Sequence, residues 1–205
     1  MPLIVLEGID GCGKTTQAGT LAGRLRAQGA VVRQLREPGG TELGEAVRAL
    51  LLAPATQTSP AAELFGYLMA RAQLVSEIIL PALARAELVL LDRFYHSTLA
   101  YQAYGLGLDP AHVRAAIALA TGGLRPDLVL WLRLDPATAQ ARRQHARSAD
   151  RIEARGLDYL TRVHQGYARM AGEGEMCEVD AGQAPEAVAQ AVWAQVAARL
   201  PALKL

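Results

Sequence analysis

The chain has 205 residues, 51% of them apolar, and a formal net charge of +1. This length and composition predict one packed domain spanning residues 1–205, and the near-neutral charge argues against broad nucleic-acid binding, which needs a basic surface. Because no apolar run approaches the ~20 residues of a membrane span and the two cysteines form no disulfide framework, we expect a cytoplasmic protein that binds neither membrane nor nucleic acid.

Short apolar runs alternate along the chain with longer segments of helical periodicity. The apolar runs predict strands at 3–6, 30–35, 87–92, 127–134 and 176–180. Helices are predicted at 14–28, 41–53, 60–86, 109–121, 135–147, 155–172 and 184–200. Since each strand is almost continuously apolar and alternates with helices, the pattern indicates a three-layer α/β domain, with a five-stranded parallel sheet covered by helices on both faces.

The first predicted strand leads into a glycine-rich loop of the form G-x-x-x-x-G-K-[ST]. The N–H groups of such a loop, together with the amino terminus of the next helix, bind phosphate groups. Lys14 is expected to reach the terminal phosphates and the Thr15 hydroxyl to bind Mg²⁺. The residues predicted to hold the nucleotide are Gly8, Ile9, Asp10, Gly11, Cys12, Gly13, Lys14, Thr15 and Thr16.

Two arginines at predicted strand ends indicate a second anion site. Arg36 ends the second strand, and Arg93 directly follows Asp92 at the end of the third. Asp92 can hold the hydration shell of Mg²⁺, and two converging guanidinium groups can grip the phosphate of an acceptor molecule. The alternative for Asp92 and Arg93 is a surface ion pair. A GTP-dependent switch is disfavoured, because the chain has no Asn for an N-K-x-D motif and a switch has no second phosphate to hold.

Four motifs together resemble the thymidylate kinase family, and their order and spacing match it over nearly the whole chain. They are GIDGCGKTT (8–16), REPGGT (36–41), DRF followed by STLAYQ (92–102), and DRIE (150–153). The resemblance implies the P-loop nucleoside monophosphate kinase fold with a small lid at approximately 142–154. It also implies ATP-dependent phosphorylation of dTMP to dTDP, by direct in-line transfer with Mg²⁺, for dTTP synthesis. UMP or dCMP as the acceptor is the nearest alternative.

The resemblance further implies how dTMP is held. Tyr67, where the family more often has Phe, and Arg71 share one helical face and would stack on and hydrogen-bond to thymine; a core role for Tyr67 is the alternative. Asp10 would contact the sugar 3′-hydroxyl, unless it points to solvent, and Tyr101 would disfavour a 2′-hydroxyl. The other implied dTMP contacts are Arg36, Pro38, Arg93, Ser97, Thr98 and Gln102.

Arginines recur every fourth residue between Arg143 and Arg155. Each like-charged pair one turn apart costs a helix ~0.2–0.5 kcal/mol, so the pattern indicates a broken helix or a transient anion, with an ordinary solvated face as the alternative. By resemblance, the catalytic cations are Lys14 and Arg93 with lid residues Arg147 and Arg151, and Arg142 stacks on adenine. The assignment among 142, 143, 147 and 151 stays open. The resemblance also implies a homodimer, for which the apolar helix around 61–84 is one possible interface and core burial an equal explanation.

Overall fold

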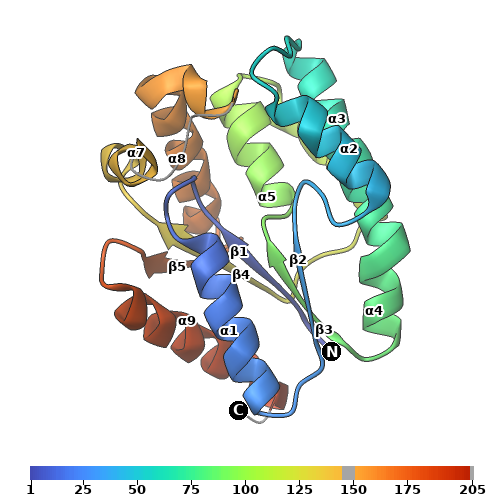
Figure 1. Cartoon of the computed structure of the whole chain (residues 1–205), viewed down its shortest axis with the longest axis vertical. Coiled ribbons are helices and arrows are strands. Elements are labelled where there is room, and N and C mark those ends of the chain that lie inside the picture. The colour runs from blue at the N-terminus through green and yellow to red at the C-terminus, as the bar shows by residue number, and fades with distance from the viewer. Residues whose placement is uncertain (145–150, 204–205) are drawn as a thin grey trace.

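The computed structural model describes residues 1–144 and 151–203. At its centre is one five-stranded sheet in the order β2-β3-β1-β4-β5, and every strand pair is parallel (Figure 1). The strands are β1 (Leu3–Glu7), β2 (Val32–Arg36), β3 (Leu88–Asp92), β4 (Leu128–Arg133) and β5 (Cys177–Asp180). The predicted five-stranded parallel sheet is confirmed, with strand ends that differ from the prediction by no more than a residue or two.

Helices cover both faces of this sheet. They are α1 (Lys14–Ala27), α2 (Glu42–Leu52), α3 (Pro60–Leu74), α4 (Leu80–Ala84), α5 (Tyr95–Thr98), α6 (Pro110–Thr121), α7 (Pro136–Gln144), α8 (Gly156–Gly172) and α9 (Pro185–Arg199). Helices α1 and α9 pack side by side on one face, in front of the strands in Figure 1. On the other face, α3, α6 and α8 pack around a π-helical segment, Leu99–Gly105, that continues α5.

Two helical segments differ from the prediction. The predicted helix 60–86 ends at Ala84 and contains a π-helical turn, Val75–Ile79, just before Pro81. A proline inside a helix lacks an N–H and its ring crowds the carbonyl four residues earlier, which explains the wider turn. The helical segment Tyr95–Gly105 was not predicted. Nearly all of it is buried, so it lacks the one-sided apolar pattern that reveals a surface helix.

By length and composition alone, Pro60–Ala84 could cross a membrane, and it is the one such helix in the part of the chain that the structure describes. Two observations identify it as a core helix instead. Leu64, Leu68 and Leu74 are buried in the hydrophobic core. Glu63 and Arg71 are buried in ion pairs with other residues of the fold. The hydrocarbon of a membrane has no charged groups that could pair with them.

The register of the sheet gathers the predicted functional residues at one edge. Asp92 pairs with Leu6 of β1 on one side and with Arg36 of β2 on the other. The carboxyl ends of β1, β2 and β3 therefore meet, and the segments that follow them leave the sheet at the same edge. In parallel α/β sheets, ligands bind at this edge.

His96, on α5, is buried beside Glu175, with 3.8 Å between Nε2 and the carboxylate. Burial lowers its pKa from 6.5 to about 4, although Glu175 opposes the shift. The folded protein thus holds His96 neutral, whereas the unfolded chain takes up a proton below about pH 6.5. Stability is therefore fully present above that pH and is lost as pH falls towards 4.

We expect the titration of His96 to lower the free energy of unfolding by roughly 2–3 kcal/mol as pH falls from 7.5 to 4.5. In His96→Phe, this part of the pH dependence will be absent. Urea unfolding at the two pH values measures it. The matched control is His112→Phe, because His112 is exposed on α6 and its loss will leave the slope unchanged. Equal slopes for wild type and His96→Phe would show that His96 titrates normally.

Candidate active site

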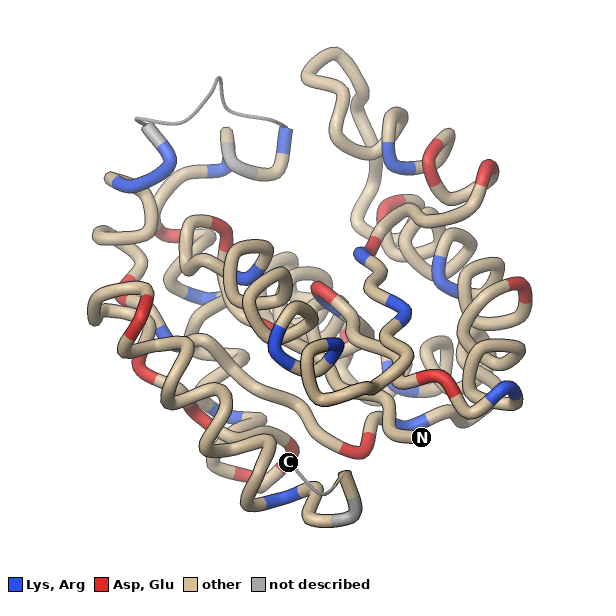
Figure 2. The backbone as a smooth tube through the Cα atoms, turned by 60° about the horizontal axis from the view of Figure 1, so that its bottom comes forward, with Lys and Arg blue, Asp and Glu red and all other residues tan. Residues whose placement is uncertain are grey.

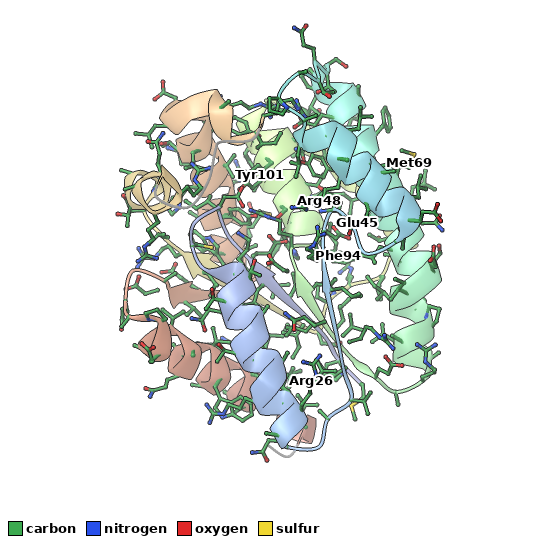
Figure 3. All side chains as sticks on the ribbon, viewed as in Figure 1. Arg26, Glu45, Arg48, Met69, Phe94 and Tyr101 are labelled. Carbon is green, nitrogen blue, oxygen red and sulfur yellow. The ribbon has the colours of Figure 1, made fainter. Side chains whose placement is uncertain are left out.

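A cleft of about 480 Å³ lies at the carboxyl edge of the sheet. It is lined by Asp10, Gly11, Gly13, Lys14, Thr15, Thr16, Arg36, Glu37, Pro38, Arg48, Leu52, Tyr67, Arg71, Asp92, Arg93, Ser97, Thr98, Tyr101, Gln102, Arg142, Arg143 and Ile152. In Figure 3, Arg48 extends from α2 and Tyr101 from the segment after β3, so separate elements supply its walls. Along the backbone as a whole, basic and acidic positions are interspersed (Figure 2).

The glycine-rich loop forms the floor of the cleft. Gly11 has a φ of 88°, and a Cβ there would lie 2.5 Å from the carbonyl oxygen of Ala139, so only glycine fits. Gly13, at φ 93°, precedes the first residue of α1 and leaves its amino terminus open to the cleft. Lys14 Nζ donates to Ile9 O at 3.0 Å and lies 3.8 Å from Asp10 Oδ1. The loop thus holds its ammonium group in place.

The other predicted loop residues contribute differently. Ile9 and Cys12 are buried under the loop, and neither they nor Gly8 line the cleft. A Cβ on Gly8, whose φ is 140°, would lie 2.7 Å from Leu132 O. These three residues shape the loop from below and do not line the cleft.

Thr15 and Asp92 bring two oxygens together where β3 ends and α1 begins. The Thr15 hydroxyl donates to Asp92 Oδ2 at 2.7 Å. Hydroxyl and carboxylate oxygens are ligands that Mg²⁺ prefers, and it usually takes one or two from a protein while keeping water and phosphate ligands. Within the described residues, no group of three His, Cys, Asp or Glu gathers around a common point. The Thr15 hydroxyl and the Asp92 carboxylate are a donor set that fits a hydrated Mg²⁺.

Arg93 stands at the centre of a partly buried polar network. Its Nη2 donates to Asp10 Oδ1 at 2.7 Å and to Tyr101 OH at 3.2 Å, and its Nη1 donates to Ser97 Oγ at 2.9 Å. Burial by itself raises the pKa of the Asp10 carboxyl, but the charges of Arg93 and Lys14 outweigh burial and hold the pKa well below its usual value. Asp10 is therefore ionised, and its partner is Arg93.

Arg36 faces the same cleft from the end of β2. Its guanidinium pairs with Glu45 of α2 at 3.0 Å and donates to Pro38 O at 3.3 Å. Arg48, which the sequence analysis did not single out, also donates to Pro38 O, at 2.9 Å, and lines the cleft. The structure thus brings Arg36 and Arg93, from two strand ends, into one cavity with Lys14 of the glycine-rich loop.

Arg71 is fixed almost completely by the protein. Its Nε and Nη2 donate to Glu37 Oε2 at 2.8 and 2.6 Å, Nη2 also donates to Phe94 O at 3.1 Å, and Nη1 donates to Thr98 Oγ1 at 2.8 Å. Arginine has five N–H groups, so one hydrogen on Nη1 is left for the cleft. Tyr67 lines the same part of the cleft and packs against Val47, Leu51 and Ala70.

The predicted lid falls partly outside the described residues, and Arg147 is among those omitted. Arg142 lines the cleft and donates to Ala181 O at 3.1 Å. Arg151 does not line it. Its Nε donates to Leu51 O at 2.8 Å and its Nη1 to Thr58 Oγ1 at 2.9 Å. In this conformation, Arg151 is bound to Leu51 of α2, to Thr58 between α2 and α3, and to Glu63 of α3, whose Oε2 lies 2.8 Å from Arg151 Nη2.

Three buried acids that support the site were not among the predicted residues. Glu7 ends β1 and accepts hydrogen bonds from the start of α5. Glu37 pairs with Arg71, and Glu63 with Arg155. Only Glu37 carried a signal, because it lies within the REPGGT motif. Glu7 and Glu63 interact with residues far away along the chain, which a local pattern does not reveal.

Comparison with known proteins gives a consistent result. A family model described as thymidylate kinase matches residues 6–192. The chain is 50% identical over 196 residues to the thymidylate kinase of Synechococcus sp. (strain RCC307), with 92% of each chain covered. It is 48% identical over 201 residues to that of Prochlorococcus marinus (strain MIT 9303), covering 95% of this chain and 93% of the relative. For that of Gloeobacter violaceus (strain ATCC 29082 / PCC 7421), identity is 45% over 197 residues, covering 94% and 93%.

Proposed function

The chain belongs to the thymidylate kinase family, and on that basis we propose that it transfers the γ-phosphoryl group of ATP to dTMP, giving dTDP and ADP. The observation that carries the proposal is that Lys14, Arg36 and Arg93 line one cleft. Lys14 and the loop beneath it suit the phosphates of ATP, while Arg36 and Arg93 suit the phosphate of the acceptor. Two phosphate-bearing molecules can thus meet end to end in it.

The transfer needs no nucleophile from the enzyme. An oxygen of the dTMP phosphate attacks the γ-phosphorus, the bond to the β–γ bridging oxygen breaks, and ADP leaves with that oxygen. The attacking phosphate is already an anion at neutral pH, so no general base is required. What the enzyme supplies is alignment and positive charge. Lys14 is held towards the cleft by Ile9 O and Asp10, and we assign it to the transferring group.

Mg²⁺ would be held by the Thr15 hydroxyl, with Asp92 binding its hydration shell. When bound, it neutralises charge on the β- and γ-phosphates of ATP. The hydrogen bond between Thr15 and Asp92 keeps both oxygens at one point of the cleft. The role of these two residues is to keep the donor nucleotide in register with Lys14.

The base-binding part of the cleft suits thymine. The single Nη1 hydrogen that Arg71 has left would donate to a base carbonyl, and Tyr67 would stack on the ring. Tyr101, whose hydroxyl Arg93 holds at 3.2 Å, would crowd a 2′-hydroxyl, and Asp10 would accept from the 3′-hydroxyl. Ser97, Thr98, Pro38 and Gln102 complete the proposed dTMP contacts.

The lid arginines remain the proposed source of charge over the transferring group. We assign Arg142 to the adenine side, since it lines the cleft, and we retain Arg147 and Arg151 as candidate catalytic cations. For Arg151 to serve, its hydrogen bonds to Leu51 O and Thr58 and its ion pair with Glu63 must break. Its role therefore requires a lid conformation different from the one described here.

An ADP-release assay with dTMP, dUMP, UMP, dCMP and AMP as acceptors tests the function. We expect the highest kcat/KM for dTMP. Faster turnover of UMP or dCMP would overturn the base-pocket assignment. Slow ATP hydrolysis that does not depend on any acceptor would instead point to a nucleotide-dependent switch.

We also propose a homodimer formed through the outer side of α3. Phe65 and Met69, one turn apart, are 64% and 48% exposed, and Met69 points away from the body of the protein (Figure 3). An apolar pair of this kind is suited to association. We expect Phe65→Glu to convert a dimer into a monomer on size-exclusion chromatography with light scattering. Leu119→Glu, on α6 and 88% exposed, is the control and will leave the dimer intact.

A further inference from the structure

Glu63, in the first turn of α3, is fully buried yet charged. Its Oε1 accepts from Gln102 Nε2 at 3.0 Å and from Arg155 Nη1 at 3.1 Å. Its Oε2 accepts from Arg155 Nη2 at 2.5 Å and lies 2.8 Å from Arg151 Nη2. Two arginines thus surround one carboxylate, and a neutral amide completes the shell.

The two arginines keep Glu63 in its acceptor-only form. Burial alone would raise its pKa, but the hydrogen bond and charge of Arg155, with help from Gln102 and Arg151, lower the pKa below its ordinary value. An ionised carboxylate only accepts hydrogen bonds. The Gln102 side chain must therefore turn its NH₂ group towards Glu63.

This constraint determines which polar atom Gln102 presents to the cleft. Gln102 is 2% exposed and lines the cleft together with Tyr67, Arg71 and Thr98. With Nε2 held by Glu63, its carbonyl oxygen Oε1 is left, and the described residues form no hydrogen bond to it. A buried amide free to flip could offer a donor or an acceptor, whereas this one offers an acceptor.

We infer that Glu63 is a positioning residue that fixes the Gln102 amide as an acceptor and so makes the cleft select pyrimidine bases that carry a hydrogen on N3. This inference rests on the proposed function and assigns a specificity role to a residue that does not line the cleft. Thymine and uracil have an N3–H donor next to the O4 carbonyl. Cytosine has the opposite pattern, with an acceptor at N3 and an amino group at C4.

Different residues hold the two side chains that would read the base, the donor Arg71 and the acceptor Gln102. Arg71 offers one remaining N–H, fixed by Glu37, Phe94 O and Thr98, to the group at C4. Gln102 offers an acceptor, fixed by Glu63, to N3. Removing the Glu63 carboxylate while Arg71 stays in place will therefore weaken discrimination against cytosine without abolishing it.

Glu63→Gln is the test, since it replaces the carboxylate by an amide of the same shape that both donates and accepts. The amide of Gln102 can then flip. We expect the ratio of kcat/KM for dTMP to that for dCMP to fall about tenfold, the discrimination that one hydrogen bond provides. A general loss of stability lowers both values and leaves the ratio unchanged.

Glu77→Gln is the matched control. Glu77 accepts from Gln73 Nε2 at 2.7 Å, so the same pair of groups occurs further along the same helical segment, on the exposed surface. This substitution will leave the ratio unchanged. If Glu63→Gln does not fold, Gln102→Leu replaces it, because that variant removes the acceptor while Glu63 keeps its arginines; the same fall in ratio is expected.

The outcomes separate this inference from the proposed function. Wild-type protein that does not phosphorylate dTMP overturns the function. A wild type that prefers dTMP, with an unchanged ratio in folded Glu63→Gln or in Gln102→Leu, overturns only the role of the Glu63–Gln102 pair. A fall in ratio confined to these variants and absent from Glu77→Gln supports it.

Discussion

Replacing Lys14 by methionine will lower kcat for dTMP phosphorylation by about 10²–10³-fold, the loss seen when one preorganised group that stabilises transition-state charge is removed. The methionine keeps most of the buried stem but removes the ammonium group that Ile9 O and Asp10 hold. Asp10 retains Arg93 as its partner, so the free energy of unfolding will change by no more than about 1 kcal/mol. Steady-state ADP release with both substrates saturating measures the effect.

Calorimetric titration with dTMP provides the control for Lys14→Met. The acceptor phosphate is assigned to Arg36 and Arg93, so the Kd of dTMP will stay within about threefold of the wild-type value, a change in binding free energy of no more than about 0.7 kcal/mol. A variant that keeps kcat within tenfold of wild type would contradict the assignment of Lys14 to the transferring group. A large loss of dTMP affinity would show that the two phosphate sites are not separate.

Replacing Glu7 by alanine will lower the free energy of unfolding by about 3–5 kcal/mol, the cost of breaking a buried charged network. Glu7 is completely buried. It accepts from the backbone N–H groups of Phe94 and Ser97 at 2.8 and 3.1 Å, from Ser97 Oγ at 2.6 Å and from Tyr167 OH at 2.9 Å. Alanine leaves the N–H of Phe94, at the start of α5, without an acceptor, and it leaves the donors of Ser97 and Tyr167 only their remaining contacts with Phe94 O and with each other. Urea unfolding monitored by circular dichroism gives the value.

Tyr167→Phe removes one donor from the same carboxylate and serves as the graded control. The same hydroxyl also hydrogen-bonds Ser97 Oγ at 2.9 Å, so we expect the variant to cost about 1–2 kcal/mol, the net value of one or two hydrogen bonds. Glu7→Ala should also reduce activity, because Ser97 Oγ, which Glu7 orients, accepts from Arg93 Nη1. Stability losses of similar size in the two variants would mean that Glu7 does not hold the start of α5.

The parts of the fold that could be predicted are those where one local pattern determines the structure. β1, β3 and β4 are continuous apolar runs between polar or glycine residues, and their bounds are close to the predicted ones. The helical segment Tyr95–Gly105 was missed because the sheet, the cleft and α8 surround it. When every side of a helix has a partner, its sequence loses the 3.6-residue alternation on which prediction depends.

In the candidate site, too, the parts that could be predicted are those that one local sequence pattern determines. The glycine-rich loop is contiguous in sequence, so its eight-residue motif predicted its position between β1 and α1. Glu63 meets Gln102 across 39 residues and Arg155 across 92, and no local pattern links them. Residues that would contact a substrate lie in family motifs that can be recognised in the sequence. Residues that orient them, such as Glu63, can be identified only from the folded structure.

The backbone of Arg93 has a φ of 73°, in the left-handed region that non-glycine residues rarely occupy. Its N–H donates to Leu6 O at 2.9 Å, which ties the first residue after β3 to β1. Glycine would adopt this conformation at lower energy, by about 1–2 kcal/mol, but has no guanidinium group. Arginine at position 93 thus costs backbone strain energy but supplies a positive charge to the cleft. Selection for thermostability would favour glycine at this position, whereas selection for turnover would favour arginine.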